Sequence, residues 1–416
     1  MNDNYNDYKH RMSRRKIKIN GTDGKPLKKI EVVIEQKAHK FLFGCSEFSC
    51  IPFANGDFKG DALKKAEERF EKFTDLFNYT TLPFYWSNFE RVKGQPDTER
   101  LKIASQWLMS KGFKIKGHPL CWHTLAPDWL LNMGNSEILS QLFERIKRDV
   151  TDFIGLVDIW DVINEVVIMP MFNKYDNGIT RICKEMGRIR LVRETFLAAK
   201  NSNPDAVLLI NDFINTGIEG YDILVNGCLE AGIPIDAIGI QAHMHQGYWG
   251  VERTEEVLEI FSRYKLPIHF TENSLVSGHL MPQDIVDLND YVIDRWESTP
   301  EGEERQAEEA VMHYKTLFKH PLVESITWWD FVDGQWLGAP VGFITQDNRI
   351  KPIYNALHKL IKSEWWTNPI HTATDDSGSV IVEGFLGEYE AKCGDSKGKF
   401  MLDKGNEDDI IEVSII

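Results

Sequence analysis

The feature that most constrains the fold is a regular alternation, from residue 41 onward, of short apolar runs with longer amphipathic stretches. Short apolar runs bounded by polar loops are typical of buried parallel strands. The sequence contains eight such candidates, at residues 41–48, 79–85, 115–122, 157–165, 207–212, 237–244, 267–272 and 325–331. Eight strand–helix units in about 320 residues predict an α/β protein with a (β/α)8 TIM barrel.

The amphipathic stretches between these runs are the expected barrel helices. One of them has an apolar stripe that repeats every 3.6 residues or so, formed by Leu63, Ala66, Phe70, Phe73 and Phe77. A last helix is expected over residues 352–361, because Pro352 suits a first helical turn. The alternative is a doubly wound open sheet, but the sequence has no GxGxxG motif or phosphate-binding loop to support it.

The two ends of the chain have a different pattern. Residues 16–36 predict two strands about a turn at residues 22–26, and residues 379–385 and 388–391 are also β-type. Because an isolated hairpin is marginally stable, we expect both ends to combine into one small β-module. The expected organisation is therefore accessory strands in residues 1–40, the barrel in 41–365, and further accessory strands in 366–416.

Composition limits the possible partners. The formal net charge of −15 argues against binding to nucleic acid. No apolar run is long enough to span a membrane. Residues 1–10 lack the apolar core of a signal peptide, so the protein is cytoplasmic or has lost a leader. The six cysteines show no CxxC spacing, which predicts neither a zinc site nor a redox motif; Cys45 and Cys50 could pair only outside a reducing compartment.

Two glutamates end strand candidates of the predicted barrel. Glu165 closes the fourth apolar run and Glu272 closes the seventh. The active site of such a barrel lies at the carboxyl ends of its strands, so both carboxyl groups should enter one cleft. Two carboxyl groups in one cleft are the equipment of a glycoside hydrolase: one protonates the leaving oxygen, and the other attacks or stabilises the anomeric carbon. The sequence therefore predicts sugar chemistry.

The residues around these glutamates resemble glycoside hydrolase family 10, whose best-known members are endo-β-1,4-xylanases. Residues 160–165, Trp-Asp-Val-Ile-Asn-Glu, are very similar to the acid/base motif of the family. Residues 117–123 resemble its third-strand motif, with Pro119 and Cys121 as substitutions. Further matches are residues 211–213, residues 239–243, Trp329 and the pair Lys351-Pro352. The resemblance extends over most of residues 41–365, and residues 34–44 are similar to members that carry an extra small β-domain.

The resemblance implies cleavage of β-1,4-xylosidic linkages in xylan or xylo-oligosaccharides with retention of configuration, Glu165 acting as acid/base and Glu272 as nucleophile. Glu165 must hold a proton at the working pH, so its pKa is expected to be raised. Asn164 would bind the sugar 2-hydroxyl, and His243 would orient Glu272. The other expected substrate-binding residues are His118, Trp122, Gln241, Trp329, Tyr85 and Trp336. The partner would be a β-linked polysaccharide or oligosaccharide, with no cofactor required.

Two positions depart from the family pattern. On the second strand, the usual sugar-binding Asn and Lys are replaced by Leu82 and Tyr85. After the nucleophile, the usual Asp that braces His243 is replaced by the uncharged Ser274. These departures leave open a β-glycanase of other specificity or a non-catalytic glycan-binding barrel. The pair His243 and His245 has metal-ligand spacing, but no third ligand is evident, so no metal site is expected.

Overall fold

A computed structural model describes residues 6–214, 217–406 and 408–416 and divides the chain into two compact units. One unit is Phe43–Tyr354, and the other joins Met1–Leu42 to Asn355–Ile416. The boundaries expected from the sequence lie after residues 40 and 365. The first five residues of the segment considered for a signal peptide lie outside the described part of the chain.

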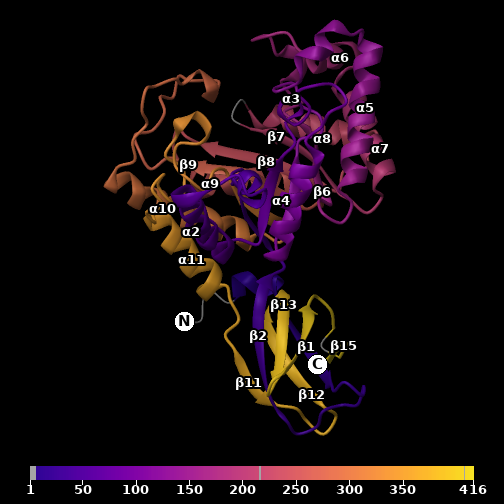
Figure 1. Cartoon of the computed structure of the whole chain (residues 1–416), viewed down its shortest axis with the longest axis vertical. Coiled ribbons are helices and arrows are strands. Elements are labelled where there is room, and N and C mark those ends of the chain that lie inside the picture. Colours follow the sequence, from indigo (N-terminus) through magenta and orange to yellow (C-terminus); the bar gives the residue numbers. More distant parts are fainter. Residues whose placement is uncertain (1–5, 215–216, 407) are drawn as a thin grey trace. The chain divides into compact units, whose positions relative to one another are not determined.

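The larger unit is a closed barrel of eight strands, as the sequence predicts (Figure 1). The strands are β3 (Leu42–Cys45), β4 (Tyr79–Pro83), β5 (Lys114–His118), β6 (Ile159–Asn164), β7 (Val207–Phe213), β8 (Ala237–Met244), β9 (Ile268–Leu275) and β10 (Val323–Trp328). They follow one another around the barrel in chain order, and β10 closes the ring against β3. Each of the eight predicted strand regions overlaps one barrel strand, so the periodicity argument is confirmed.

Helices follow the barrel strands along the chain. They are α1 (Cys50–Ala54), α2 (Gly60–Leu76), α3 (Trp86–Phe89), α4 (Thr98–Ser110), α5 (Asn135–Asp152), α6 (Gly178–Met186), α7 (Arg188–Ser202), α8 (Ile218–Glu230), α9 (Gly250–Ser262), α10 (Pro300–Lys319) and α11 (Pro352–Lys359). The predicted stripe of α2 is buried at Ala66, Phe70 and Phe73. A π-helical turn, Leu360–Glu364, follows α11, and short 3-10 helices occupy Asn6–Arg11, Asp128–Asn132, Met169–Met171, Leu288–Asp290 and Trp336–Gly338.

Large aromatic side chains pack together at strand β6, and a glycine on the neighbouring strand β5 leaves room for them. Trp160 of β6 is fully buried, and its ring centroid lies 4.8 Å from that of Phe84. Gly117 on the neighbouring strand β5 faces this indole, and a Cβ atom there would lie 2.2 Å from a ring carbon. A side chain at position 117 would therefore displace the indole, which explains why the strand next to the acid/base motif carries a glycine.

Two strand ends differ from the sequence expectation in a way that matters for the site. Strand β6 ends at Asn164, so Glu165 lies just beyond it and has a φ of 54°. Strand β9 continues through Leu275, so Glu272 lies inside the strand rather than at its end. A register shift in the pairing of β8 with β9, between Ile240 and Gln241, accompanies this placement. Irregularities of this kind re-aim side chains near active sites.

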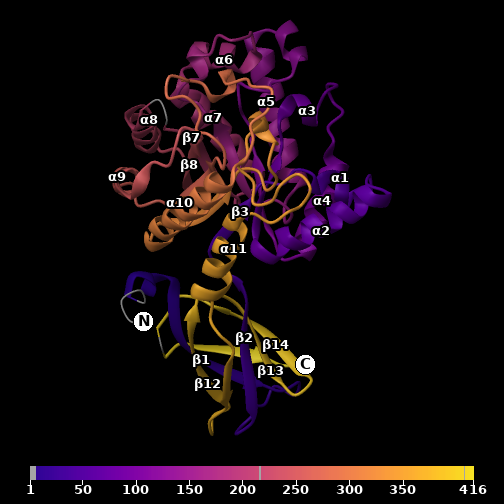
Figure 2. The same ribbon diagram turned by 90° about the vertical axis from the view of Figure 1, so that its left-hand side faces the viewer.

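The smaller unit is a β-sandwich (Figure 2). Its strands are β1 (Met12–Asn20), β2 (Glu31–His39), β11 (Ile370–Ala373), β12 (Ser379–Phe385), β13 (Gly387–Cys393), β14 (Ser396–Leu402) and β15 (Ile410–Ser414). One sheet has the order β12-β1-β15, and the other has the order β11-β2-β13-β14. Apolar side chains from both sheets, Ile17 and Tyr389 among them, form one buried cluster.

The two N-terminal strands do not form the hairpin that the turn at residues 22–26 suggests. Strand β1 pairs with β12 and β15, whereas β2 pairs with β11 and β13. The turn therefore carries the chain from one sheet to the other. The alternating burial of both strands explains this result, because each has an apolar face that a two-stranded hairpin would leave in water.

Two further expectations concern cysteines and membrane segments. All six cysteines are free thiols, so Cys45 and Cys50 do not pair. Within the described residues, no helix combines the length and the apolar character needed to cross a membrane.

Candidate active site

One cavity at the carboxyl end of the barrel brings the predicted site residues together. Its volume is about 510 Å³, in the range of pockets that hold small ligands. All ten residues that the sequence predicts for the site line it: Glu165, Glu272, Asn164, His118, Trp122, Gln241, His243, Trp329, Tyr85 and Trp336. The residue types in this wall are mainly carboxyl, amide, imidazole and aromatic groups, which is the composition expected of a site for a polar ligand with apolar faces.

Glu165 has an unusual backbone conformation, and three side chains hold its carboxyl group. Its positive φ is uncommon for a residue with a side chain and is typical of functional sites. Trp122 donates its Nε1–H to Oε2 at 2.9 Å, and the amides of Asn164 and Gln241 donate to Oε1 at 3.3 Å. Burial raises the pKa of Glu165 to about 8, and the negative charges of Glu272 and Asp212 act in the same direction. Glu165 is therefore protonated at neutral pH.

Glu272 is also buried, but its surroundings favour the charged form. Burial alone would raise the pKa of Glu272; the hydrogen bond with His243 and the positive charge of Lys116 more than offset that effect and lower it. The Nε2 atom of His243 lies 3.0 Å from Oε2, and Asn211 donates to Oε1 at 3.0 Å. His118 Nε2 lies 4.0 Å from the same Oε1 atom. The two carboxyl groups thus differ in protonation because they differ in hydrogen-bond partners.

A set of amides connects the two glutamates. The Oδ1 atom of Asn164 accepts hydrogen bonds from Asn211 at 2.8 Å and from Gln241 at 3.0 Å. Asn211 and Gln241 in turn donate to Glu272 and Glu165, respectively. Thr271 donates to Asn211 at 2.6 Å and thereby fixes which end of that amide faces the carboxylate. These side chains come from β6, β7, β8 and β9, so four neighbouring strands hold the two carboxyl groups in one arrangement.

Behind His243 lies a second hydrogen-bonded group that replaces the missing carboxylate. The hydroxyl of Ser274 lies 3.0 Å from Nδ1 of His243 and 3.0 Å from Nε2 of His245. His245 is fully buried, and burial together with the neighbouring His243 lowers its pKa to about 3. His243 therefore rests on a neutral hydroxyl–imidazole pair rather than on an anion.

Beneath the cavity, a buried ion pair positions His118. The Oδ2 atom of Asp161 lies 2.7 Å from His118 Nδ1 and 2.6 Å from Lys116 Nζ, and all three side chains are inaccessible to solvent or nearly so. Burial opposes ionisation of Asp161, but Lys116 and His118 outweigh it and lower the pKa of the carboxyl group. The Nε2 atom of His118 is thereby directed towards the cavity and Glu272.

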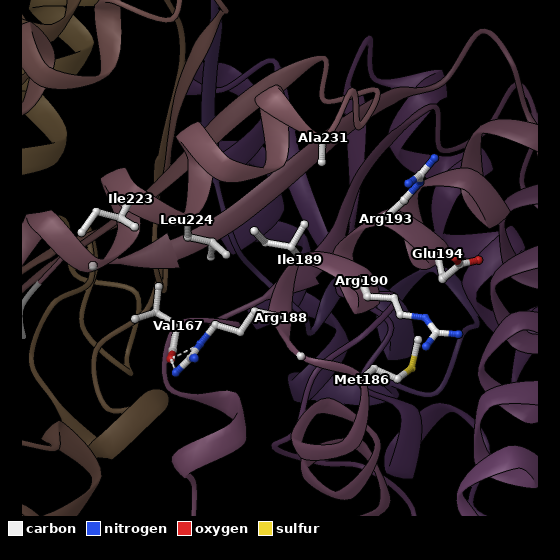
Figure 3. Close-up of a pocket in the computed structure, with 12 residues that line it drawn as sticks. Val167, Met186, Arg188, Ile189, Arg190, Arg193, Glu194, Ile223, Leu224 and Ala231 are labelled. Carbon is white, nitrogen blue, oxygen red and sulfur yellow. Dashed lines mark hydrogen bonds between the residues drawn. The ribbon is translucent and has the colours of Figure 1, made fainter.

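In the segment after Glu165, side chains bind both the backbone N–H and the backbone carbonyl of Val167. The backbone N–H of Val167 donates to Asp212 at 2.9 Å, while Arg188 donates to its carbonyl oxygen through Nε at 2.8 Å and Nη2 at 2.6 Å. Burial raises the pKa of Asp212 to about 7. Figure 3 shows Arg188 directed at Val167 in the wall of a second cavity of about 820 Å³, which residues of α7 and α8 line.

The second-strand substitutions change one side of the site. Leu82 is fully buried in β4 and does not line the cavity, whereas Tyr85 does. The Tyr85 ring lies 5.6 Å from Trp122 and 5.7 Å from His118 in centroid distance, so it packs in an aromatic wall. Among the described residues that line the cavity, Lys174 is the one lysine or arginine, and it comes from the segment after β6. No lysine or arginine from β4 enters this site, within the described residues.

Some residues of the site were not singled out from the sequence. Asn211 was noted only as part of a matching motif, yet it contacts Glu272; its place at the end of a predicted strand was the available signal. His245 was considered as a metal ligand, but the described residues contain no group of three or more His, Cys, Asp or Glu side chains that could hold a metal ion. Phe172, Tyr175, Phe213, Lys174 and residues 286–289 also line the cavity, and they lie in segments without a strong periodic pattern.

Comparison with known proteins agrees with this architecture. The chain is 26% identical over 320 residues to endo-1,4-beta-xylanase B of Thermotoga neapolitana, an alignment that covers 73% of this chain and 86% of that protein. It is 23% identical over 383 residues to the anti-sigma-I factor RsgI6 of Acetivibrio thermocellus, covering 90% of this chain but only 44% of that protein. The crystal structure of xylanase 10B from Thermotoga petrophila in complex with xylobiose matches the fold with a TM-score of 0.63 at 21% identity, covering 78% of this chain and 95% of that one.

The family model described as glycosyl hydrolase family 10 matches residues 60–360. This range contains both glutamates and every one of the ten cavity residues named above. Because the match covers well over half of the chain, the protein belongs to glycosyl hydrolase family 10 and is a glycoside hydrolase.

Proposed function

We propose that this enzyme hydrolyses β-1,4-xylosidic linkages in xylan or xylo-oligosaccharides by double displacement, with retention of anomeric configuration. The observation that carries the proposal is the opposite displacement of two pKa values in one cavity: that of Glu165 is raised to about 8, and that of Glu272 is lowered. A protonated and an ionised carboxyl group side by side are what an acid and a nucleophile require.

In the first step, the Glu272 carboxylate attacks the anomeric carbon while Glu165 gives its proton to the departing glycosidic oxygen. The bond between the anomeric carbon and the leaving oxygen breaks, and an ester between the sugar and Glu272 forms. The hydrogen bonds from Asn211 and His243 leave Glu272 ionised and aimed before the attack. Trp122, which donates to Glu165, then stabilises the carboxylate that remains after proton transfer.

In the second step, Glu165 acts as a base. Formation of the ester removes the negative charge of Glu272, one of the causes that raise the pKa of Glu165. The Glu165 carboxylate can therefore take a proton from water as that water attacks the anomeric carbon and releases Glu272. Two carboxyl groups and one water molecule complete the reaction, so this proposal requires no cofactor.

The remaining cavity residues would bind the sugar. We assign Asn164 to the 2-hydroxyl of the sugar at the cleavage point, and His118 and Gln241 to the same ring. Trp122 and Trp329 would enclose that sugar, with Tyr85 and Trp336 extending the aromatic wall. Indole and phenol faces suit the apolar faces of sugar rings, whereas the amides and imidazoles suit hydroxyl groups.

The assignment to xylan is supported by membership of the family and by the names of its relatives, of which endo-1,4-beta-xylanase B of Thermotoga neapolitana is one. A β-glycan of other composition is the second candidate, favoured by one observation. The second-strand position expected to supply an amide holds Leu82, which is fully buried. A site that loses polar donors loses discrimination for the hydroxyl groups they would bind.

The test is product release from xylan, xylo-oligosaccharides, mixed-linkage glucan and cello-oligosaccharides, with Glu165→Gln and Glu272→Gln variants in parallel. We expect xylo-oligosaccharide cleavage that Glu272→Gln abolishes and Glu165→Gln lowers by at least about 10²-fold, and a first-formed product with β configuration by proton NMR. A slowly hydrolysed 2-fluoro xyloside should label Glu272, which mass spectrometry of the digested protein identifies. Cleavage of glucan alone would reassign the substrate, and binding without cleavage of any glycan in a folded protein would favour a non-catalytic barrel.

A further inference from the structure

Residues 276–299 form a segment that belongs to the cavity but to no part of the reaction described above. The segment, called the strap here, connects β9 to α10, and its one regular element is the 3-10 helix Leu288–Asp290. In Figure 1 it is the long orange stretch between these two elements. Its position in the chain places it directly after the strand that carries Glu272.

The strap is an ordered structure with its own apolar core. Val276, Met281, Leu288 and Trp296 are buried together with Ala339 and Val341 from the segment after β10. Hydrogen bonds hold it at the end of β8 as well. The backbone N–H of Met281 donates to the carbonyl of His245 at 3.0 Å, and the side chain of Gln246 donates to two strap carbonyl groups at 2.8 and 2.9 Å. Such a cluster gives the strap one favoured conformation, to which the ion pairs described below add.

The strap reaches across the mouth of the barrel. Its residues 286–289 line the same cavity as Glu165 and Glu272. On the far side, Lys174 from the segment after β6 lies 2.6 Å from Asp287 and 2.6 Å from Asp290. The charge of Asp287 also acts on the pKa of His123, which follows β5. Lys174 follows β6 and the strap follows β9, so the ion pairs join the segments after the strand that leads to Glu165 and the strand that carries Glu272.

We propose that Lys174, Asp287 and Asp290 determine substrate specificity by holding the strap across the cleft, so that the enzyme acts on short xylo-oligosaccharides and on chain ends in preference to interior linkages of long chains. This inference rests on the proposed function. A long chain can lie with an interior linkage at the cleavage point only if it enters the cleft from the side. A polypeptide segment joined to the opposite wall blocks that route and leaves entry by a free chain end.

The ion pairs that close the strap are partly exposed. The side chain of Lys174 is 40% exposed, and those of Asp287 and Asp290 are 38% and 61% exposed. Surface pairs of this kind are weak and are screened by salt. The strap therefore opens at a modest cost, and its closure should depend on ionic strength.

The experiment compares kcat/KM on long-chain soluble xylan with kcat/KM on xylotetraose for the full chain and for Lys174→Met. We expect the ratio of polymer to oligosaccharide activity to rise about 2- to 10-fold in the variant, the range that two weak ion pairs can shift an opening equilibrium. Raising the salt concentration should increase the ratio in the unaltered enzyme and leave it constant in the variant. Lys184→Met, at an exposed position of α6, is the matched control and should change neither rate.

A charge-reversed pair separates closure from a general effect of losing Lys174. In Lys174→Asp combined with Asp287→Lys, made in an Asp290→Asn background so that position 174 faces no second carboxylate, the lysine stands on the strap and the carboxylate on the other side of the cleft, so an attraction across the cleft is restored with its direction exchanged. We expect this combined variant to regain the preference for oligosaccharides. An unchanged ratio in Lys174→Met, or a rapid fall in xylan viscosity per reducing end released by the unaltered enzyme, would overturn the inference while leaving xylosidic cleavage established. Absence of any xylosidic cleavage would instead overturn the proposed function, and this inference with it.

Discussion

The Oγ atom of Ser274 lies 3.0 Å from Nε2 of His245, a residue that neither contacts Glu272 nor lines the cavity. The direction of the hydrogen bonds follows from Glu272. Because the ionised carboxylate can only accept, Nε2 of His243 carries the proton, and Nδ1 accepts from the Ser274 hydroxyl. The serine oxygen then accepts from His245, which leaves Nδ1 of His245 bare; within the described structure that atom indeed has no hydrogen-bond partner.

We expect Ser274→Ala to lower kcat/KM by about 5-fold, because the hydrogen bond between Ser274 and His243, worth about 1 kcal/mol, no longer fixes the ring of His243. Ser274→Thr keeps the hydroxyl and should restore most of the activity. Kinetics at several pH values, with the thermal midpoint of each variant, check this. Ser105→Ala is the control, since Ser105 is equally buried but bonds to a carbonyl of its own helix. Unaltered kinetics in Ser274→Ala would mean that the hydrogen bond between Ser274 and His243 is not needed to position the imidazole.

The activity of the enzyme should follow a bell-shaped pH profile. The free enzyme is active when Glu272 is ionised and Glu165 is protonated. Activity should therefore rise as pH passes the lowered pKa of Glu272 and fall as it passes about 8, where Glu165 loses its proton. Glu165→Gln should lower the rate on unactivated substrates by about 10²–10⁴-fold and remove the alkaline fall. The measurement is kcat/KM from pH 3 to 10, and an alkaline limb that persists in Glu165→Gln would assign it to another group.

Trp122 offers a way to move that alkaline limb. Its indole N–H donates to Glu165 at 2.9 Å and favours the carboxylate, which lowers the pKa. Trp122→Phe removes this donor, so the pKa of Glu165 should rise, and the alkaline limb should move to higher pH by about one unit. Trp129→Phe is a matched control, because Trp129 is a partly buried indole that donates to a backbone carbonyl instead. A shift to lower pH in Trp122→Phe would contradict the assignment.

Arg145 supports the strands that carry His118 and Trp122. It is buried in α5, pairs with Asp149 at 3.1 Å, and donates to the carbonyl groups of Leu120, Phe84 and Pro119. Arg145→Met leaves three buried carbonyl groups without this donor and removes one of the two arginines, Arg145 and Arg148, that pair with the buried carboxylate of Asp149, so we expect a loss of about 3–5 kcal/mol in the free energy of unfolding. Denaturant titration measures it. Arg190→Met, at an exposed position of α7, should change the free energy of unfolding by no more than about 0.5 kcal/mol. A loss equal to that of Arg145→Met would contradict a specific role for Arg145.

The chain should stay soluble without the β-sandwich only if all of the strands of the sandwich are removed together. Deleting residues 366–416 removes β11 to β15, which are the pairing partners of β1 and β2. The two remaining strands would expose unpaired edges, and we expect aggregation in size-exclusion chromatography. Deleting residues 1–41 as well should give a soluble barrel with a cooperative thermal transition. A contrary result is a protein that aggregates without both terminal segments but stays soluble without residues 366–416 alone. It would mean that the two sheets of the sandwich do not fold as a unit of their own.

The barrel could be predicted from the sequence because its signal is local. Each strand is an apolar run of fixed length, and each helix has a 3.6-residue stripe, as in α5, where Ile138, Leu142 and Ile146 are all fully buried. The two strands about the turn at residues 22–26 were predicted from equally local signals, but the different sheets that they enter were not. Pairing between β1 and β12 joins residues more than 350 positions apart, and no turn signal reports such contacts.

The site was predictable in part for a similar reason. Glu165 and Glu272 stand in motifs, and the barrel itself explains why such residues meet. The role of His245 was not evident, because it depends on Ser274 lying across from it in the pairing of β8 with β9. The strap was missed since residues 276–299 have no periodic pattern, and its contact with Lys174 joins two irregular segments.

The pairing of β1 with β12 and β15 has a consequence for how the chain folds as it is synthesised. A ribosome makes β1 before the barrel strands and β12 after them, so residue 12 waits until residue 385 has emerged before the two can pair. At about 5–20 residues per second, that interval is on the order of 20–70 s. Throughout it, every segment of the barrel is made while β1 and β2 lack their strands. Strand β1 is thus made before the barrel and is among the last strands to reach its native contacts.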